Sequence, residues 1–102
     1  MRLKLKGLNE LFGFSLHLLV FEMFLENVDS FMNLREISRK VDKNPGSISR
    51  ILPMLVQNKL LKQIRVGKNM FIYCLNKENK VVKLIIEFYK KLKNSQSLRV
   101  EH

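Results

Sequence analysis

The chain has 102 residues, 46% of them hydrophobic, which is enough for one small core but not for several domains. Its single cysteine, Cys74, excludes an internal disulfide and a cysteine-based metal cluster within one chain. The net charge of +10 is unevenly placed: residues 34–76 carry +7, residues 77–102 carry +4 and residues 1–33 carry −1. A surface that only kept the protein soluble would intersperse both signs, so this distribution favours a nucleic-acid partner.

The first predicted helix covers residues 15–26 and is apolar around most of its circumference. Such a helix must be covered on more than one side. His17 and Glu22 interrupt the apolar run, which lacks a small-residue cleavage site and is too short to cross a bilayer. We therefore expect a cytoplasmic protein with neither a signal peptide nor a membrane span.

The second predicted helix begins at Leu34. Asn33 and Glu36 fit a capping box, in which each side chain binds the backbone N–H of the other residue. Apolar or small residues then recur at helical spacing, at Leu34, Ile37, Ser38 and Val41. Asp42 and Lys43 interrupt this stripe, which predicts a turn after it.

The third predicted helix covers residues 45–58, because Asn44 is a good cap and a proline follows at the first helical position. The residues expected to face the core are Ile48, Ile51, Leu52, Leu55 and Val56. Pro53 removes a backbone donor at a cost of about 3 kcal/mol in an ideal helix. We therefore expect a kink or an early end, and a left-handed residue at Asn58 or Lys59 where a glycine is usual.

A β-hairpin follows at residues 61–75. Residues 61–66 and 70–75 are rich in β-branched and aromatic types and flank a turn of Gly67, Lys68 and Asn69. The aromatic residues Phe71 and Tyr73, like those from Phe12 to Phe31, lie at core spacing and do not indicate a base-stacking platform. The hairpin is therefore expected to end in a cationic tip.

Two helices joined by a short turn and followed by such a hairpin form the order of a winged helix-turn-helix. The chain resembles archaeal winged helix-turn-helix transcriptional regulators of the MarR/ArsR-like type, including the group found next to or fused to nucleotidyltransferases. The matching segments are Phe12-Gly13, the helix to Glu26, Leu34 to Ile37, Asn44-Pro45 through Leu55, and Arg65-Val66-Gly67 through Leu75-Asn76. The resemblance implies a mostly α fold with a small β-hairpin wing (α+β) and an archaeal source. Pro53 departs from it, since relatives usually carry a basic or polar residue there.

A recognition helix at residues 45–58 would enter the major groove, and the wing would approach the backbone or the minor groove. Arg50 is the best candidate for reading a base, because its planar guanidinium can hold guanine through two hydrogen bonds. A phosphate contact or a surface ion pair is an equal alternative. The full set of expected DNA contacts is Arg35, Arg39, Lys43, Gly46, Ser47, Ser49, Arg50, Arg65, Lys68 and Asn69. The alternative for the two serines and for Arg35, Arg39 and Lys43 is that they only face water.

A last helix is predicted at residues 80–93, followed by a polar, flexible tail at residues 94–102. Residues 1–93 would form a single domain, with its DNA-reading part at residues 33–76. We expect two copies to pair through apolar side chains at both ends of the chain, namely Leu8, Leu11, Phe12, Val81, Leu84, Ile85, Phe88 and Leu92. The alternative is that these residues complete a monomeric core.

No catalytic constellation is evident, since His17 and His102 have no nearby partner for acid–base or metal chemistry. No cofactor is implied and no effector ligand is identified. The leading hypothesis is a dimeric repressor, associated with the nucleoid, that binds double-stranded DNA sequence-specifically. The alternatives are a winged-helix adaptor for a protein such as a nucleotidyltransferase, and an architectural protein that binds DNA of any sequence.

Overall fold

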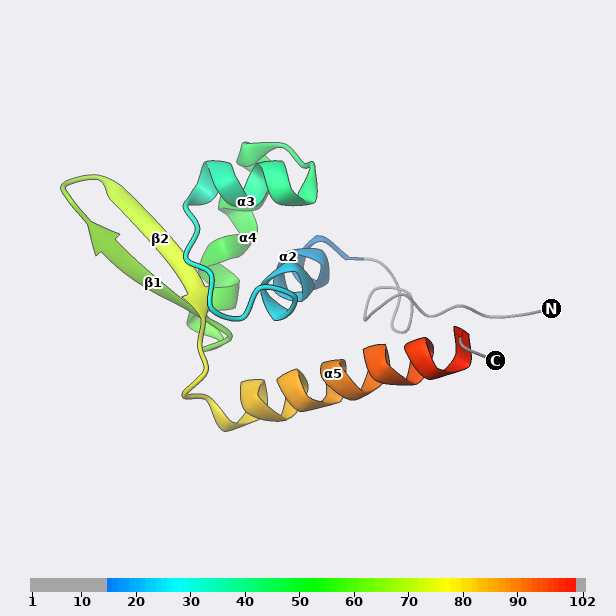
Figure 1. Cartoon of the computed structure of the whole chain (residues 1–102). Helices are drawn as coiled ribbons and strands as arrows, with labels where there is room; N and C mark the ends of the chain where they lie inside the picture. Colours follow the sequence, from blue (N-terminus) through cyan, green and yellow to red (C-terminus); the bar gives the residue numbers. More distant parts are fainter. Residues whose placement is uncertain (1–14, 101–102) are drawn as a thin grey trace.

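The structure, a computed structural model, describes residues 15–100, with side chains described to residue 95. Its elements in chain order are α2 (Leu16–Leu25), α3 (Leu34–Val41), α4 (Pro45–Gln57), β1 (Leu61–Val66), β2 (Met70–Leu75) and α5 (Lys80–Val100) (Figure 1). Four helices and an antiparallel hairpin over these residues confirm the predicted winged-helix fold. None of the helices so described is both long and apolar enough to cross a membrane.

The core is built around α2, which lies between the α3–α4 pair and α5 (Figure 1). Val20 and Phe24 of α2 are fully buried, as are Ile37 of α3 and Ile48 of α4. The rest of the buried core comes from α4, the hairpin, α5 and the loop before α3, and comprises Met32, Ile51, Leu52, Leu55, Leu61, Leu75, Val82 and Tyr89. Because α2 is covered on two sides, its nearly continuous apolar surface is explained by packing within one chain.

The capping box at the start of α3 is confirmed. The Glu36 backbone N–H donates to the Asn33 side-chain oxygen at 2.9 Å, and the Asn33 N–H donates to a Glu36 carboxylate oxygen at 2.9 Å. The helix ends at Val41, and Asp42, its C-cap, takes the left-handed conformation (φ 56°) that Asp and Asn tolerate better than most residues. The expected turn between the two helices therefore follows directly.

Pro53 does not end α4 early, and that alternative was wrong. The helix runs from Pro45 to Gln57 with Pro53 inside it. Both Pro53 and Ser49, whose carbonyl loses its helical donor, are exposed, so water can replace the missing hydrogen bond. The carbonyl that lacks a helical donor because of Pro53 therefore belongs to a surface residue and not to a core residue.

The turn after α4 is held by two asparagines from the segment between β2 and α5. Lys59, not Asn58, takes the left-handed conformation (φ 65°). The side-chain amides of Asn76 and Asn79 each donate to the Lys59 carbonyl oxygen at 2.9 Å. We call these two hydrogen bonds the asparagine clamp. The clamp joins the end of α4 to the start of α5.

The hairpin has the predicted strands and turn. Its register pairs Leu61 with Leu75 and Val66 with Met70, and Gly67 (φ 78°) supplies the left-handed residue of the turn. Leu61 and Leu75 enter the core, whereas the tip extends away from it (Figure 1). Met32 adds one antiparallel bridge to the outer edge of β2.

Two aromatic residues that we expected at core positions are exposed. Phe31 is 56% exposed and Phe71 is 38% exposed. Phe31 lies in the loop before α3, and Phe71 lies beyond the part of β2 that reaches the core. Whether these side chains are buried depends on which elements lie opposite them in the fold. Spacing along the chain does not predict those neighbours.

Helix α5 continues to Val100, so the expected end at Lys93 and the separate tail from residue 94 were wrong over residues 94–100. The segment contains no glycine or proline to stop the helix, and its polar residues are compatible with a solvated helical surface. Val82 and Tyr89 of α5 are buried in the core. Ile85 and Leu92, expected at a dimer interface, also pack partly against the core.

A polar cluster fastens α5 to α2. The Tyr89 hydroxyl lies 2.5 Å from a Glu26 carboxylate oxygen and 3.2 Å from one of Glu22. Lys93 lies 3.3 Å from Glu26, with its ammonium over the Tyr89 ring. The hydrogen bond from Tyr89, assisted by Lys93, lowers the pKa of Glu26 below its ordinary value of 4.5. Burial and the two carboxylates raise the pKa of Tyr89, which keeps its proton for this contact.

This cluster predicts an acid-sensitive contribution to stability. Because the folded-state pKa of Glu26 is lowered, its contribution is complete above pH about 5 and is lost as the pH falls through the folded-state value. The urea midpoint of the wild type is expected to fall more between pH 5 and pH 3 than that of Glu26→Gln. Parallel pH profiles of the two proteins, measured by circular dichroism at one protein concentration, would contradict this role of Glu26.

Candidate nucleic-acid interface

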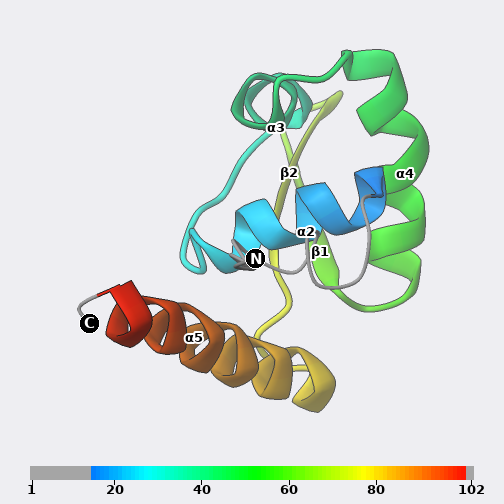
Figure 2. The ribbon, with the colours of Figure 1, turned by 90° about the vertical axis from the view of Figure 1, so that its right-hand side faces the viewer.

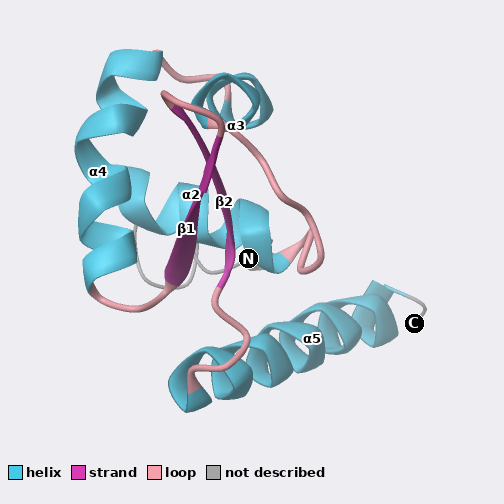
Figure 3. Cartoon of the chain, turned by 90° about the vertical axis from the view of Figure 1, so that its left-hand side faces the viewer, coloured by secondary structure: helices cyan, strands magenta, loops and turns pink. Residues whose placement is uncertain are grey.

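The expected DNA contacts gather at one end of the molecule. In Figures 2 and 3 the first turns of α4, helix α3 and the tip of the hairpin lie together at the end opposite α5. We call this region the cationic end, since its exposed basic residues are Arg35, Arg39, Lys40, Lys43, Arg50, Arg65 and Lys68. The fold therefore brings together charges that lie more than thirty positions apart in the chain.

Helix α4 presents its first turns to solvent. Asn44 caps it by accepting from the Gly46 N–H at 2.6 Å, and a Cβ on Gly46 would lie only 3.0 Å from that capping oxygen. Arg50 is exposed on the same part of the helix, and Ser47 is half-buried. The Ser49 hydroxyl donates to the Gly46 carbonyl at 2.9 Å, which leaves its oxygen free only to accept.

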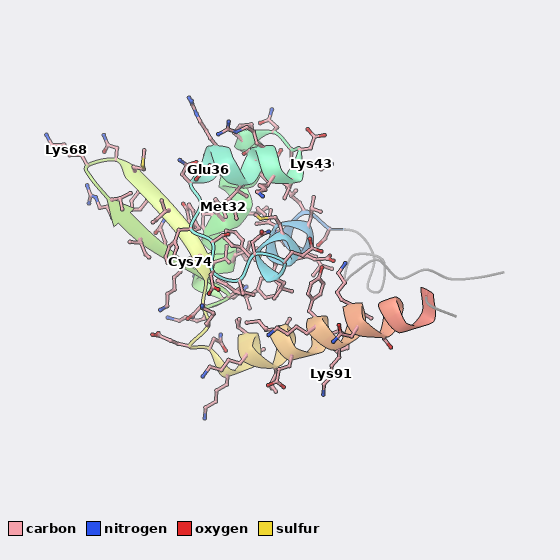
Figure 4. The ribbon with its side chains drawn as sticks, in the orientation of Figure 1. Met32, Glu36, Lys43, Lys68, Cys74 and Lys91 are labelled. Carbon is pink, nitrogen blue, oxygen red and sulfur yellow. The ribbon has the colours of Figure 1, made fainter. Side chains whose placement is uncertain are left out.

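The wing tip holds one of its cations in a set position. The Arg65 guanidinium donates to the Lys68 backbone carbonyl at 2.5 Å, so it lies along the turn instead of extending freely. Lys68 is at the outermost point of the hairpin (Figure 4), and Asn69 beside it is exposed. An arginine held by a hydrogen bond beside an exposed lysine at a loop tip is suited to phosphate oxygens.

Helix α3 supplies the remaining charges, spread along its length. Arg35 and Arg39 are exposed, and Lys43 lies in the turn that follows α3, well away from Lys68 (Figure 4). The structure does not bring Lys43 and the wing tip together. The two mark opposite sides of the cationic end, which is the arrangement needed to contact a wide ligand.

One exposed cation of this end, Lys40, was missed by the sequence reasoning. Its position directly after Arg39 was a visible signal, since both belong to the basic last turn of α3. Arg39 and Lys40 also line an open hollow of about 490 Å³ beside the loop before α3, whose other lining residues are Ser30, Phe31, Met32 and Glu36. Two cations and one carboxylate line the hollow, so its lining is net positive.

The opposite end carries an exposed apolar surface on α5. Val81 is 56% exposed, Leu84 65% and Phe88 44%. We call these three residues the α5 stripe. Lys91, two turns beyond Leu84, points away from the rest of the molecule in Figure 4, so this side of α5 faces outward. Leu8, Leu11 and Phe12, expected to extend the same surface, lie outside the described residues.

Neither metal nor thiol chemistry is indicated in the described part of the chain. Residues 15–95 contain no group of three His, Cys, Asp or Glu side chains that could hold a metal ion. Cys74 is buried, and its burial raises the pKa of the thiol, which fits the expected packed cysteine. His17 is half-buried on α2.

Comparison with known proteins identifies the fold. No family model and no curated protein matches the chain. Among solved structures it is similar to SPO1453 of Silicibacter pomeroyi DSS-3, a MarR family transcriptional regulator, with a TM-score of 0.63 and 10% identity over 90% of this chain and 63% of that one. RV1404 of Mycobacterium tuberculosis gives a TM-score of 0.63 and 13% identity over 90% and 62%.

A mutant of ZitR from Lactococcus lactis in apo form gives a TM-score of 0.62 and 17% identity over 82% of this chain and 67% of that one. The chain therefore spans about two thirds of the length of these structures. These similarities establish a common winged-helix fold. One of the proteins with this fold, SPO1453, is a transcriptional regulator.

Proposed function

We propose that the protein is a transcriptional regulator that binds double-stranded DNA through its cationic end. The observation that carries the proposal is the grouping of exposed Arg and Lys residues from α3, the first turns of α4 and the wing tip on one end of a winged helix. Phosphates neutralised by this end would supply most of the affinity and make it fall steeply with salt. The similarity of fold to a MarR family regulator supports the same conclusion.

In this proposal α4 enters the major groove with its first turns. The helix is of a size that the groove admits, and Gly46 lets its backbone approach closely because no side chain projects there. Arg50 reaches a base edge, while Arg35, Arg39 and Arg65 contact phosphates. The hydrogen bond between Arg65 and the wing turn fixes where the wing meets the backbone.

We further propose that two copies pair through the α5 stripe. Its three exposed apolar side chains have no cover from the described part of their own chain, and they lie at the end opposite the cationic one. A twofold dimer formed there would carry two α4 helices, one for each half-site of the DNA. Its half-sites would be spaced about 10 base pairs apart, or a small multiple. Occupancy of a near-palindromic operator would then block a promoter, which is repression.

The test is selection of bound sequences from a random double-stranded DNA library at about 150 mM salt, where non-specific binding is already weakened. An inverted repeat among the bound sequences is the expected result. Bound DNA without a common motif would instead favour an architectural protein. If no DNA is bound, the regulator proposal fails and a protein-binding adaptor becomes the better account of the fold.

Replacing Arg50 tests the reading of a base. Arg50→Ala is expected to weaken binding to the selected site by about 1 to 3 kcal/mol and binding to random DNA by less, because a bidentate contact discriminates between bases. Fluorescence anisotropy with both DNAs would measure the difference. Lys40→Ala, which removes the same charge from α3, is the control and should weaken both DNAs alike. Equal losses for Arg50→Ala would reduce this residue to a phosphate contact.

A further inference from the structure

The wing has an aliphatic face that the helix-turn-helix does not use. Side chains alternate between the two faces of a strand, so the register places Val66 and Met70 opposite one another on one face, with Ile64 and Ile72 behind them. Leu61 and Leu75 lie on the other face and enter the core. The four aliphatic side chains therefore point away from the core.

This face is open to solvent where it is farthest from the core. Met70 is 53% exposed, and Val66 and Ile64 are each 37% exposed. An antiparallel strand usually presents polar residues on its solvated face, so paired aliphatic residues at a hairpin tip are unexpected for a surface that meets only water. We call Val66 and Met70 the wing-tip pair.

The charges beside the wing-tip pair indicate its partner. Residues 61–75 contain no acidic residue. Arg65 precedes Val66 and is held against the turn by its bond to the Lys68 carbonyl, and the Lys68 side chain forms the outermost point of the wing. An aliphatic pair flanked directly by cations is complementary to a ligand that combines a phosphate backbone with apolar surface. Double-stranded DNA offers both in its minor groove, where sugars and base edges lie between two rows of phosphates.

We propose that the wing-tip pair is an apolar wedge that enters the minor groove and partly unstacks a base step beside each bound half-site. This inference rests on the proposed binding of DNA by the cationic end. Arg65 and Lys68 hold the phosphates on either side, and Met70, the more exposed and flexible of the pair, contacts the step. Because pyrimidine–purine steps unstack most easily, the wing would favour such a step without any hydrogen bond to a base.

Permanganate footprinting tests the wedge, because permanganate oxidises thymines that have lost their stacking. The DNA is a duplex carrying the site recovered by selection, and hydroxyl-radical protection locates the wing on it. With wild-type protein, a thymine at the wing position is expected to become several-fold more reactive than in free DNA. Energy transfer between dyes at the duplex ends should report a bend of roughly 20° or more.

Two variants separate the apolar side chain from the charge of the wing. Met70→Ala should abolish the reactive thymine while leaving the DNA protected. Met70→Lys adds a cation, so it should bind random DNA more tightly and still show no reactive thymine. Asn94→Ala is the control: Asn94 is exposed on α5, at the end of the molecule opposite the wing tip, and its replacement should keep the wild-type signal.

The outcomes separate the two proposals. Absence of DNA protection by the wild type would remove the proposed function itself. Protection without a reactive thymine, or a reactive thymine that persists in Met70→Ala, would overturn the wedge and leave DNA binding intact. If the wedge is overturned in either of these ways, the aliphatic face of the wing would be a surface for another protein.

Discussion

Replacing Phe24 with alanine is expected to destabilise the protein by about 3 to 5 kcal/mol, the range seen when a buried phenylalanine is truncated. Phe24 is fully buried on α2, and α2 lies between the helix-turn-helix and α5. The cavity would open where these units meet, so no single element could close it by moving. A domain of this size has a total stability of about 5 to 15 kcal/mol, so the loss would remove a large part of it.

Urea unfolding measures this effect, with the protein concentration held constant because a dimer would add a concentration-dependent term. Phe31→Ala is the matched control, since it removes the same atoms from a side chain that is 56% exposed. It should change stability by no more than about 0.5 kcal/mol. A loss below about 1 kcal/mol for Phe24→Ala would show that the core is not organised around α2.

Placing a carboxylate on the α5 stripe is expected to separate the proposed dimer. Leu84 is the most exposed residue of the stripe, at 65%, so Leu84→Glu should leave the folded chain unharmed. In a dimer the new charge would be buried beside its symmetry mate, which is strongly unfavourable. Affinity for an inverted repeat would then fall by about 10²- to 10⁴-fold, because the second half-site no longer binds intramolecularly.

Sedimentation at micromolar concentration gives the oligomeric state, and anisotropy gives DNA affinity on one and two half-sites. Lys90→Gln is the control, since it changes the net charge by the same amount at an exposed position of α5 outside the stripe. This variant should remain dimeric. A wild type that sediments as a monomer would remove the dimer, whereas a dimer unaffected by Leu84→Glu would place the interface elsewhere.

The helix starts and the hairpin were predictable because their causes are local. The capping box of Asn33 and Glu36 spans four positions, and Asn44 caps α4 by accepting from the N–H of Gly46, two positions later. Gly67 supplies the one left-handed residue that the hairpin turn requires. Each feature is decided by neighbours along the chain, so the sequence contains all the information needed.

Features that depend on distant neighbours were less predictable. The apolar residues of α5 looked like one wide stripe, but Val82 and Tyr89 face the core while Leu84 faces outward. Periodicity shows that a helix has an apolar side, not which part of that side its own chain covers. The exposure of Phe31 and Phe71 has the same cause, because burial is set by the elements opposite.

At the candidate interface the sequence identified every exposed cation except Lys40, but not how the fold brings them together. Arg50 and Lys68 are far apart in the chain, and only the packing of the hairpin beside α4 places both at one end. The bond from Arg65 to the Lys68 carbonyl depends on the exact shape of the turn. The aliphatic face of the wing was visible in the sequence as alternation, but its lack of a cover required the fold.

In the proposed dimer, the asparagine clamp would limit how much the distance between two operator half-sites can vary. Asn76 and Asn79 donate to the Lys59 carbonyl, so the segment after the helix proposed to read DNA is tied to the segment before the helix proposed to join two copies. A swing of α5 relative to α4 would have to break both hydrogen bonds. Each subunit of the proposed dimer would therefore be stiff between its two binding surfaces, and operators whose half-sites are respaced by even one base pair should be bound poorly.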